Sequence, residues 1–290
     1  MVLTLHLGAH KTASTHLQNS LRMVQGQLRA GGVFYADPAQ LRGEGLPMTR
    51  QLRWRNPAAV AGIAACVSAA RHVFPEMLLS DENILGGTHR SRLFGRQGMV
   101  YPGAGLRLRR LLDLAGGGPA LLCLAVRDPA PFNVSAFALQ LLLGNETGIE
   151  AYLQGRDPAR LSWTGLVRRL AAVPGVAGVL VWRYEDYAAL RPRLLARLLP
   201  PPLVALVPDP PRSNESLTQP GLDWFLSALA RDAGADRRLL ARAARERFPR
   251  AGGHAALRPL PEAAYRRSAR HYAEDMARLA DLPGVELLRP

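Results

Sequence analysis

The chain has 290 residues, with 37 basic and 23 acidic side chains and a formal net charge of +14 at pH 7. Apolar residues make up 48% of it and charged residues 21%, as in an ordinary globular protein, which excludes an intrinsically disordered chain. Arginine is scattered from Arg22 to Arg289 without forming a basic stripe, so we expect no nucleic-acid partner. The longest uncharged stretch, 129–145, carries Asn133 and Gln140, so we expect no transmembrane segment.

Strand-like apolar runs alternate with helix-like periodic segments along the first 200 residues. The run ALLCLAV at 120–126 is apolar throughout, which is typical of a strand buried on both faces of a parallel sheet. We therefore predict an α/β fold in three layers, with helices on both faces of a central parallel sheet. The predicted strands are 2–7, 76–80, 120–126 and 177–182, with shorter ones at 33–36 and 285–288. The predicted helices are 14–30, 57–73, 103–115, 131–144, 159–172 and 186–199.

The composition changes after three consecutive prolines at 200–202. A Pro-rich passage runs to Pro211, and helical patterns follow at 218–232, 236–247 and 261–281. We predict a single domain over 1–290, with an α/β nucleotide-binding core at 1–200 and a helical elaboration at 201–290. The segment 37–56 has no clear period and is expected to be a long loop over the site. Since an apolar strand begins at Val2, we expect no leader segment and a cytoplasmic location.

The only lysine, Lys11, lies in the sequence GAHKTAST between the first predicted strand and a helix that begins near Ser14. A strand, a tight turn and a helix start form the usual cradle for a phosphate. The compact ammonium of lysine fits such a turn better than a guanidinium does. The triphosphatase loop G-x-x-x-x-G-K-[ST] is not matched, because Leu5 and His10 occupy its glycine positions. A hydroxyl still follows at Thr12, so a kinase stays open.

Two further strand ends carry polar side chains, and ligands bind beyond the carboxyl ends of such strands. Glu82 follows the strand at 76–80 and could act as a general base on a hydroxyl; alternatively, Asp81 or Asn83 caps a helical turn there. Arg127 ends the strand at 120–126, and Ser135 follows eight residues later in a helix. The two could grip one phosphate, or Arg127 could simply pair with Asp128.

Together these motifs resemble the PAPS-dependent sulfotransferases over about residues 1–190. The stretch HKTASTHLQ resembles the family's 5′-phosphosulfate loop, K-[ST]-G-T-T-x-[LW]. The pair Arg127 and Ser135, eight residues apart, matches the family's 3′-phosphate motif. The stretch WRYED at 182–186 is similar to a later Tyr-Glu-Asp element, whose tyrosine lies near the adenine. The resemblance implies a P-loop NTPase-like sheet.

The resemblance also implies a role for each residue. Lys11 would contact the bridge between the 5′-phosphate and the sulfuryl group, and Glu82 would be the base, with His10 as an alternative. Arg127 and Ser135 would bind the 3′-phosphate. The family's reaction needs no metal, so none is expected. The cofactor-binding residues implied are Lys11, Thr12, Ala13, Ser14, Thr15, His16, Arg127, Ser135, Tyr184 and Arg212, together with the backbone N–H groups of 9–15.

The chain departs from the family pattern in three places. Ala13 replaces the usual glycine of the loop, which constrains the turn. His16 stands where one branch of the family has an adenine-stacking tryptophan. That branch also has a C-terminal Arg-Lys-Gly loop, and the segment at 212–216 (RSNES) is the candidate replacement for it.

The leading hypothesis is therefore a sulfotransferase that transfers the sulfuryl group of PAPS to a hydroxyl of a carbohydrate or glycolipid. The Arg-rich segments at 50–55 and 90–96 either line the acceptor site and favour an anionic acceptor, or are solvated surface arginines. A P-loop kinase that uses ATP and magnesium is the second hypothesis. A non-catalytic basic module that binds nucleotides or polyanions is the third.

Overall fold

The structure is a computed structural model that describes residues 2–43, 45–95, 99–211 and 216–290. Its centre is a parallel sheet with the strand order β2-β3-β1-β4-β5-β6. The strands are β1 (Val2–His6), β2 (Val33–Ala36), β3 (Glu76–Ser80), β4 (Ala120–Val126), β5 (Val176–Arg183) and β6 (Val285–Leu288). Each lies within one residue of its predicted bounds. The prediction of a three-layer α/β fold on a parallel sheet is confirmed.

The longer helices follow the predicted periodic segments, with one break. The predicted helix at 14–30 divides at Val24, whose φ of −114° and ψ of 21° are not helical. The helices of the first half are α1 (Ser14–Met23), α2 (Gln25–Ala30), α3 (Pro38–Arg42), α4 (Met48–Gln51), α5 (Pro57–Val73), α6 (Arg90–Leu93), α7 (Ala104–Leu114) and α8 (Pro129–Leu142). The second half has α9 (Ile149–Leu153), α10 (Trp163–Ala171), α11 (Tyr187–Leu198), α12 (Pro201–Val204), α13 (Gln219–Arg231), α14 (Arg237–Arg247) and α15 (Glu262–Ala280). The short helices α3, α4, α6, α9 and α12 were not predicted.

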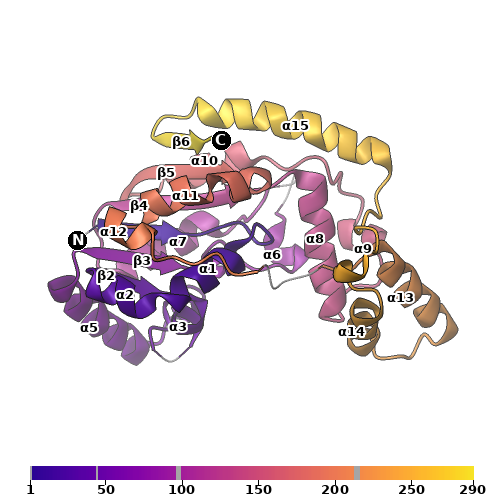
Figure 1. Ribbon diagram of the computed structural model, residues 1–290, viewed down its shortest axis with the longest axis horizontal. Helices are drawn as coiled ribbons and strands as arrows, with labels where there is room; N and C mark the ends of the chain where they lie inside the picture. The colour runs from indigo at the N-terminus through magenta and orange to yellow at the C-terminus, as the bar shows by residue number, and fades with distance from the viewer. Residues whose placement is uncertain (1, 44, 96–98, 212–215) are drawn as a thin grey trace.

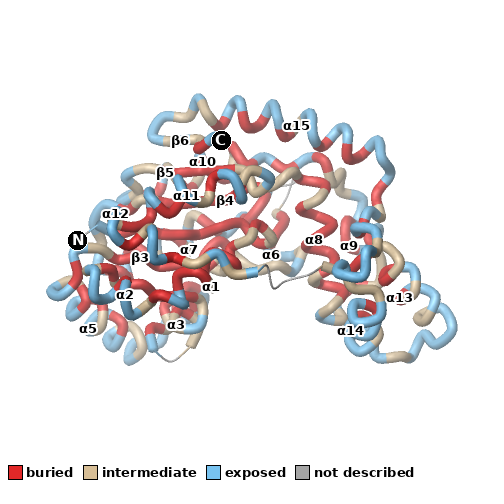
Figure 2. The backbone as a smooth tube through the Cα atoms, viewed as in Figure 1, coloured by how far each residue is buried: buried red, intermediate tan, exposed pale blue. Residues whose placement is uncertain are grey.

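Both faces of the sheet are buried, as the apolar strands predict. Along β4, Leu122 and Leu124 point into one hydrophobic core, while Cys123 and Ala125 point into another. Helices α1, α2, α11 and α12 cover the second core, and α5, α7, α8, α10 and α15 cover the first. Figure 2 shows the strands buried between these two layers. Because side chains alternate across a strand, every second residue of β4 packs on the same layer.

The segment 37–56 is not the long loop that we expected. It forms α3 and α4, and its side chains Leu41 and Met48 are fully buried in the core. A capping box starts α3: the Asp37 side chain accepts from the Gln40 N–H at 3.1 Å, and Pro38 occupies the first helical position. Helices this short show no periodicity in the sequence, which is why the expectation was wrong.

The C-terminal region adds helices and also returns to the sheet. Helices α13 and α14 pair with each other and project beside the end of α8, away from the N-terminus (Figure 1). Helix α15 then runs back over α8 and α10, and β6 pairs with β5 at Val179–Trp182. The region after residue 200 therefore supplies one edge strand of the sheet as well as the predicted helices.

Candidate functional site

The candidate site lies at the carboxyl ends of the strands, where β1 stands between β3 and β4. From β1 the chain goes to β2 and β3 on one side of β1, and it then crosses to β4 on the other side. The strand order therefore reverses between β1 and β4, and parallel sheets bind ligands at such a reversal. The loop after β1 starts there. Its first residues extend the pairing with β4, since Leu7 N–H donates to Cys123 O at 2.9 Å and Ala9 N–H donates to Ala125 O at 3.0 Å.

The loop turns tightly through three residues with positive φ. Gly8 has a φ of 44°, and Lys11 and Ala13 each have a φ of 66°. A side chain at Gly8 would be strained at this φ, and its Cβ would lie 2.1 Å from Ser14 Oγ, so Ser14 would have to move. Ala13 adopts the left-handed conformation at the position where the family pattern has glycine, so the loop holds a strained residue there. Thr12 braces the turn, because its hydroxyl donates to Ala9 O at 2.5 Å.

The backbone N–H groups of the loop divide into bound and free ones. Those of Ala9 and His10 are engaged, the second by Tyr101 Oη at 3.0 Å. Those of residues 11–15 have no acceptor within the described parts of the chain, and no side chain caps α1. The Ser14 hydroxyl beside them is buried and has no partner there either. Of the N–H groups of 9–15 that we expected to bind a phosphate, only those of 11–15 are therefore available. They lie at a helix N-terminus, which favours an anion.

Arg127 joins this loop from the end of β4. Its Nη1 donates to Lys11 O at 2.9 Å, although the two residues are 116 positions apart. Its guanidinium lies over the Tyr184 ring, 4.4 Å from the centroid. The structure thus brings Lys11, Arg127 and Tyr184 together, as the motifs predict.

Neither Lys11 nor Arg127 has a carboxylate partner among the residues that the structure describes. The alternative that Arg127 pairs with Asp128 fails, because Asp128 caps α8 and accepts from the Ser268 hydroxyl. The Nε of Arg127 is buried without a partner. Burial, and then the charge of Arg127, lower the pKa of the Lys11 ammonium. Two uncompensated cations at one place call for an anionic ligand.

Ser135 lies about two turns into α8, the helix that begins just after Arg127. The residue is 7% exposed, and within the described residues its hydroxyl forms no hydrogen bond, although its oxygen is not one of the fully buried unpaired atoms. A hydroxyl that is accessible and unpaired can donate to a phosphate oxygen.

Helix α15 supports the ends of β4 and β5, which the sequence reasoning missed. Glu185 Oε1 accepts from the Asp128 N–H at 2.9 Å, and its Oε2 accepts from the Tyr272 hydroxyl at 3.1 Å. The Ser268 hydroxyl accepts from the Ala130 N–H at 2.8 Å. No local pattern in the sequence could have indicated these contacts, since α15 is more than 80 residues away from the strand ends it braces.

Glu82 is held from two sides. Its Oε1 accepts from Arg42 Nη2 at 2.9 Å, and its Oε2 accepts from Gln18 Nε2 at 3.0 Å. Asp81 beside it is fully buried and accepts from the Asn83 N–H at 2.8 Å, so the predicted cap of the turn exists as well. Burial alone would raise the pKa of Glu82, but His10, Arg42 and Gln18 lower it to about 2.

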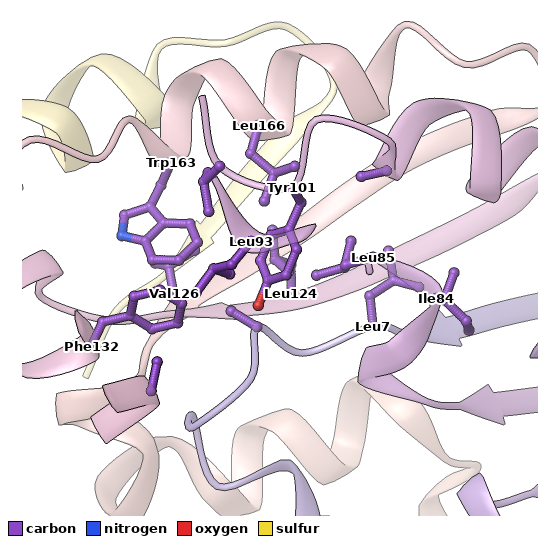
Figure 3. Close-up of a cluster of buried hydrophobic side chains, with 14 of the residues drawn as sticks. Leu7, Ile84, Leu85, Leu93, Tyr101, Leu124, Val126, Phe132, Trp163 and Leu166 are labelled. Atoms are coloured by element: carbon purple, nitrogen blue, oxygen red, sulfur yellow. The ribbon is translucent and has the colours of Figure 1, made fainter. Parts of the chain in front are cut away.

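His10 is buried in a closed chain of hydrogen bonds. The Tyr101 hydroxyl, which accepts from the His10 N–H, donates to His10 Nδ1 at 2.7 Å. His10 Nε2 therefore carries the proton and donates to the Asn83 carboxamide oxygen at 2.9 Å. Figure 3 shows Tyr101 in the core with its oxygen facing the loop after β1. Burial lowers the pKa of His10, so the ring is neutral and has no free nitrogen for a base.

The remaining predicted residues are distributed as follows. His16 Nδ1 lies 2.9 Å from Tyr187 Oη, and its Nε2 lies 2.7 Å from Pro210 O, so the ring joins α1 to the Pro-rich passage. Thr15 is exposed at the start of α1. Arg212 lies outside the described residues. The residues that are described contain no group of His, Cys, Asp or Glu able to hold a metal ion. None of their helices is long and apolar enough to cross a membrane.

No family model and no curated protein matches the chain. A similar solved structure is a sulfotransferase from Alicyclobacillus acidocaldarius, with 15% sequence identity and a TM-score of 0.42. The match covers 83% of this chain and 96% of that one.

Proposed function

We propose that this protein is a PAPS-dependent sulfotransferase. The observation that carries the proposal is the anion site built by Lys11, Arg127 and the N–H groups of residues 11–15. Two basic residues from different strand ends lie together without a carboxylate, beside a helix N-terminus. A nucleotide with phosphates at both its 5′ and 3′ ends offers one anion to the loop and a second to Arg127 and Ser135.

The chain's own groups divide the chemistry between them. Lys11 stabilises the charge that develops on the departing 5′-phosphate when the bond between sulfur and phosphate oxygen breaks. The acceptor hydroxyl oxygen forms the new bond to sulfur, and its proton passes to the Glu82 carboxylate. His10 does not take this proton, because its Nε2 already carries one and its Nδ1 accepts from Tyr101.

The acceptor follows from the family resemblance and from charge. We propose a carbohydrate or glycolipid hydroxyl, on a molecule that carries an anionic group, and a cytoplasmic location. Arg42, Arg90 and Arg107 lie around the turn that holds Glu82 or on the segment after it. Of these, Arg90 pairs with Glu146, and Arg107 donates to the carbonyl groups of Asn83 and Ile84, so both guanidinium groups hold the segments that follow β3.

Binding of the product nucleotide PAP tests the proposal against a kinase. Calorimetry should show that PAP binds more tightly than ADP or ATP and that magnesium does not change this order. Arg127→Ala should weaken PAP binding roughly 10- to 100-fold, the range expected for losing a charge-assisted contact, and should affect ADP much less. Arg168→Ala, at an exposed arginine on α10, is the matched control and should leave PAP binding unchanged.

The opposite pattern would contradict the proposal. A preference for ATP that requires magnesium would identify a kinase. Equal, salt-sensitive binding of all three nucleotides and of an unrelated polyanion would identify a non-catalytic basic module.

A further inference from the structure

Both carboxylate oxygens of Glu82 are occupied by donors from elements on opposite sides of it. Gln18 lies on α1, and its Nε2 also donates to Ser80 Oγ at 3.2 Å. Arg42 ends α3, on the segment that we expected to be a loop, and spans Glu82 and Asp81 with distances of 2.9 and 2.5 Å from Nη2. The Glu82 side chain is 17% exposed, so it is oriented by these two donors and still reachable.

Arg42 is itself anchored, which makes it a rigid donor. Three of its hydrogen bonds go to Asp81, whose side chain is fully buried and also accepts from Thr49 Oγ1 at 2.7 Å. A guanidinium that grips one carboxylate in this way presents its remaining N–H at a fixed place. The remaining N–H of Arg42 Nη2 points to Glu82 Oε1.

His10 and Arg42 both lower the pKa of Glu82 when charged, but at neutral pH only Arg42 carries a charge. His10 faces Glu82 from the loop after β1, but burial lowers its pKa and its hydrogen bonds suit the neutral ring. His6 on β1 is neutral as well, since burial lowers its pKa to about 4. The guanidinium keeps its charge at every working pH. The charged or titratable groups that face Glu82 are Arg42 from α3, Asp81 from its own turn, His6 from β1, His10 from the loop, Tyr35 from β2 and Tyr101 from the segment before α7.

We propose that Arg42, together with Gln18, is the positioning residue that holds Glu82 as an oriented carboxylate for proton transfer. The proposal rests on the proposed function, in which Glu82 accepts the proton of the acceptor hydroxyl. Among the described residues, the side-chain hydrogen bonds of Arg42 go to Asp81 and Glu82 and not to the loop that holds Lys11, so it acts through Glu82. It has no counterpart in the motifs that the sequence analysis identified.

A weakly basic carboxylate suits this reaction. A free hydroxyl is far too weak an acid to give its proton to a clamped glutamate. Once its oxygen has bonded to sulfur, however, the same hydroxyl becomes strongly acidic and transfers its proton readily. Glu82 therefore takes the proton late, after the bond to sulfur has begun to form and the bond to the phosphate oxygen has begun to break. What Glu82 must supply is a fixed position and a constant negative charge.

The test is the pH dependence of kcat/KM for transfer from PAPS to a labelled acceptor fraction. In the wild type the loss of activity at low pH that reports Glu82 should lie below pH 4.5, its ordinary pKa. In Arg42→Gln, burial is no longer opposed by the guanidinium, so the pKa rises and this loss should move up by about one pH unit or more. Arg42→Lys keeps the charge and should lower kcat with little change in the pH profile.

Matched variants separate positioning from folding. Arg258→Gln removes an arginine that pairs with Glu262 at 2.7 Å on the surface, and it should leave the profile unchanged. Arg42→Gln combined with Asp81→Asn removes both charges, so the buried Asp81 is not left unpaired. Gln18→Met leaves Arg42 and Asp81 intact and should lower kcat. If the double variant folds and the profile of every variant matches the wild type, Arg42 does not position Glu82.

A carboxyl titration followed by NMR keeps this inference distinct from the proposed function. The Glu82 resonance is assigned by its loss in Glu82→Gln, and its midpoint should rise in Arg42→Gln whether or not the protein has activity. If the midpoint rises but Glu82→Gln turns over PAPS normally, Arg42 does position the Glu82 carboxylate, and Glu82 is not the base. If the midpoint does not move, the inference is wrong even where PAP binds and turnover is observed.

Discussion

Lys11 has a φ of 66°, a conformation that few residues with a side chain adopt. The hydrogen bond from Arg127 Nη1 to Lys11 O stabilises it, and the N–H groups of residues 11–15 have no acceptor among the described residues. The side chain is half-buried, and among the described residues it has no ion-pair partner. A conformation of this kind is maintained at a cost in stability, and such residues cluster at ligand sites.

Replacing Lys11 by alanine tests the role of its ammonium group. If the ammonium stabilises charge on the departing phosphate, kcat should fall by ~10²–10³, or about 3–4 kcal/mol, as for other preorganised electrostatic groups. The rate of transfer from radiolabelled PAPS measures it. Lys11→Arg keeps the charge but places a larger group in the tight loop, so it should restore little of the lost rate. Unchanged turnover in the alanine variant would remove Lys11 from the mechanism.

Among the helices, α15 has the largest part in shaping the candidate site, because it contacts the residues that follow β4 and β5. Its Ser268 and Tyr272 hydroxyls bond to Asp128 and Glu185, the residues that follow Arg127 and Tyr184. The same turn is held by Trp163 Nε1, which donates to Arg127 O at 2.8 Å. Helix α15 therefore holds the neighbours of Arg127, which is expected at the 3′-phosphate, and of Tyr184, which is expected near the adenine.

Removing these hydroxyls should loosen the nucleotide site. Ser268→Ala and Tyr272→Phe should each weaken PAP binding roughly 3- to 10-fold, since one hydrogen bond contributes about 1 kcal/mol. Calorimetric titration with PAP measures this. Tyr152→Phe is the control, because its buried hydroxyl has no partner in the described part of the chain. If all three variants bind PAP alike, α15 has no part in shaping the site.

At the scale of the whole molecule, α15 also joins the sheet to α10. The buried carboxylate of Asp275 accepts from the N–H groups of Trp163 and Thr164 at 2.6 and 3.2 Å, at the N-terminus of α10. Trp163 packs edge-on against Phe132 in the core that Figure 3 shows, with ring centroids 5.1 Å apart. One carboxylate thus connects the C-terminal helix to the centre of the fold.

Asp275→Ala should therefore destabilise the entire protein. The substitution leaves two N–H groups at the start of α10 without their acceptor, which costs about 1–3 kcal/mol. Chemical denaturation should show this as a lower midpoint with an unchanged slope. Glu274→Ala, at the exposed neighbour, serves as the control and should change the midpoint by less than about 0.5 kcal/mol. Equal midpoints for the two variants would contradict this account of α15.

The sequence by itself determined the strands of the sheet, the longer helices and the turn that contains Lys11, because these depend on neighbouring residues. Apolar runs located the strands β1 to β6, and the lone lysine lies, as predicted, between a strand and a helix start. Local patterns fail where helices are too short to show a period, which is why α3 and Arg42 were read as loop.

Only the tertiary structure decided how the site is supported. Arg42 meets Glu82 across 40 residues, Tyr272 meets Glu185 across 87, and Ser268 meets Asp128 across 140. Such pairs depend on how helices pack on a sheet, and nothing in the neighbouring sequence records it. The same packing occupied the N–H groups of Ala9 and His10 and left those of residues 11–15 open. The neighbouring sequence was thus enough to find Lys11. The residues that hold Glu82 and the turns after Arg127 and Tyr184, namely Arg42, Ser268 and Tyr272, come into contact with them only through the fold.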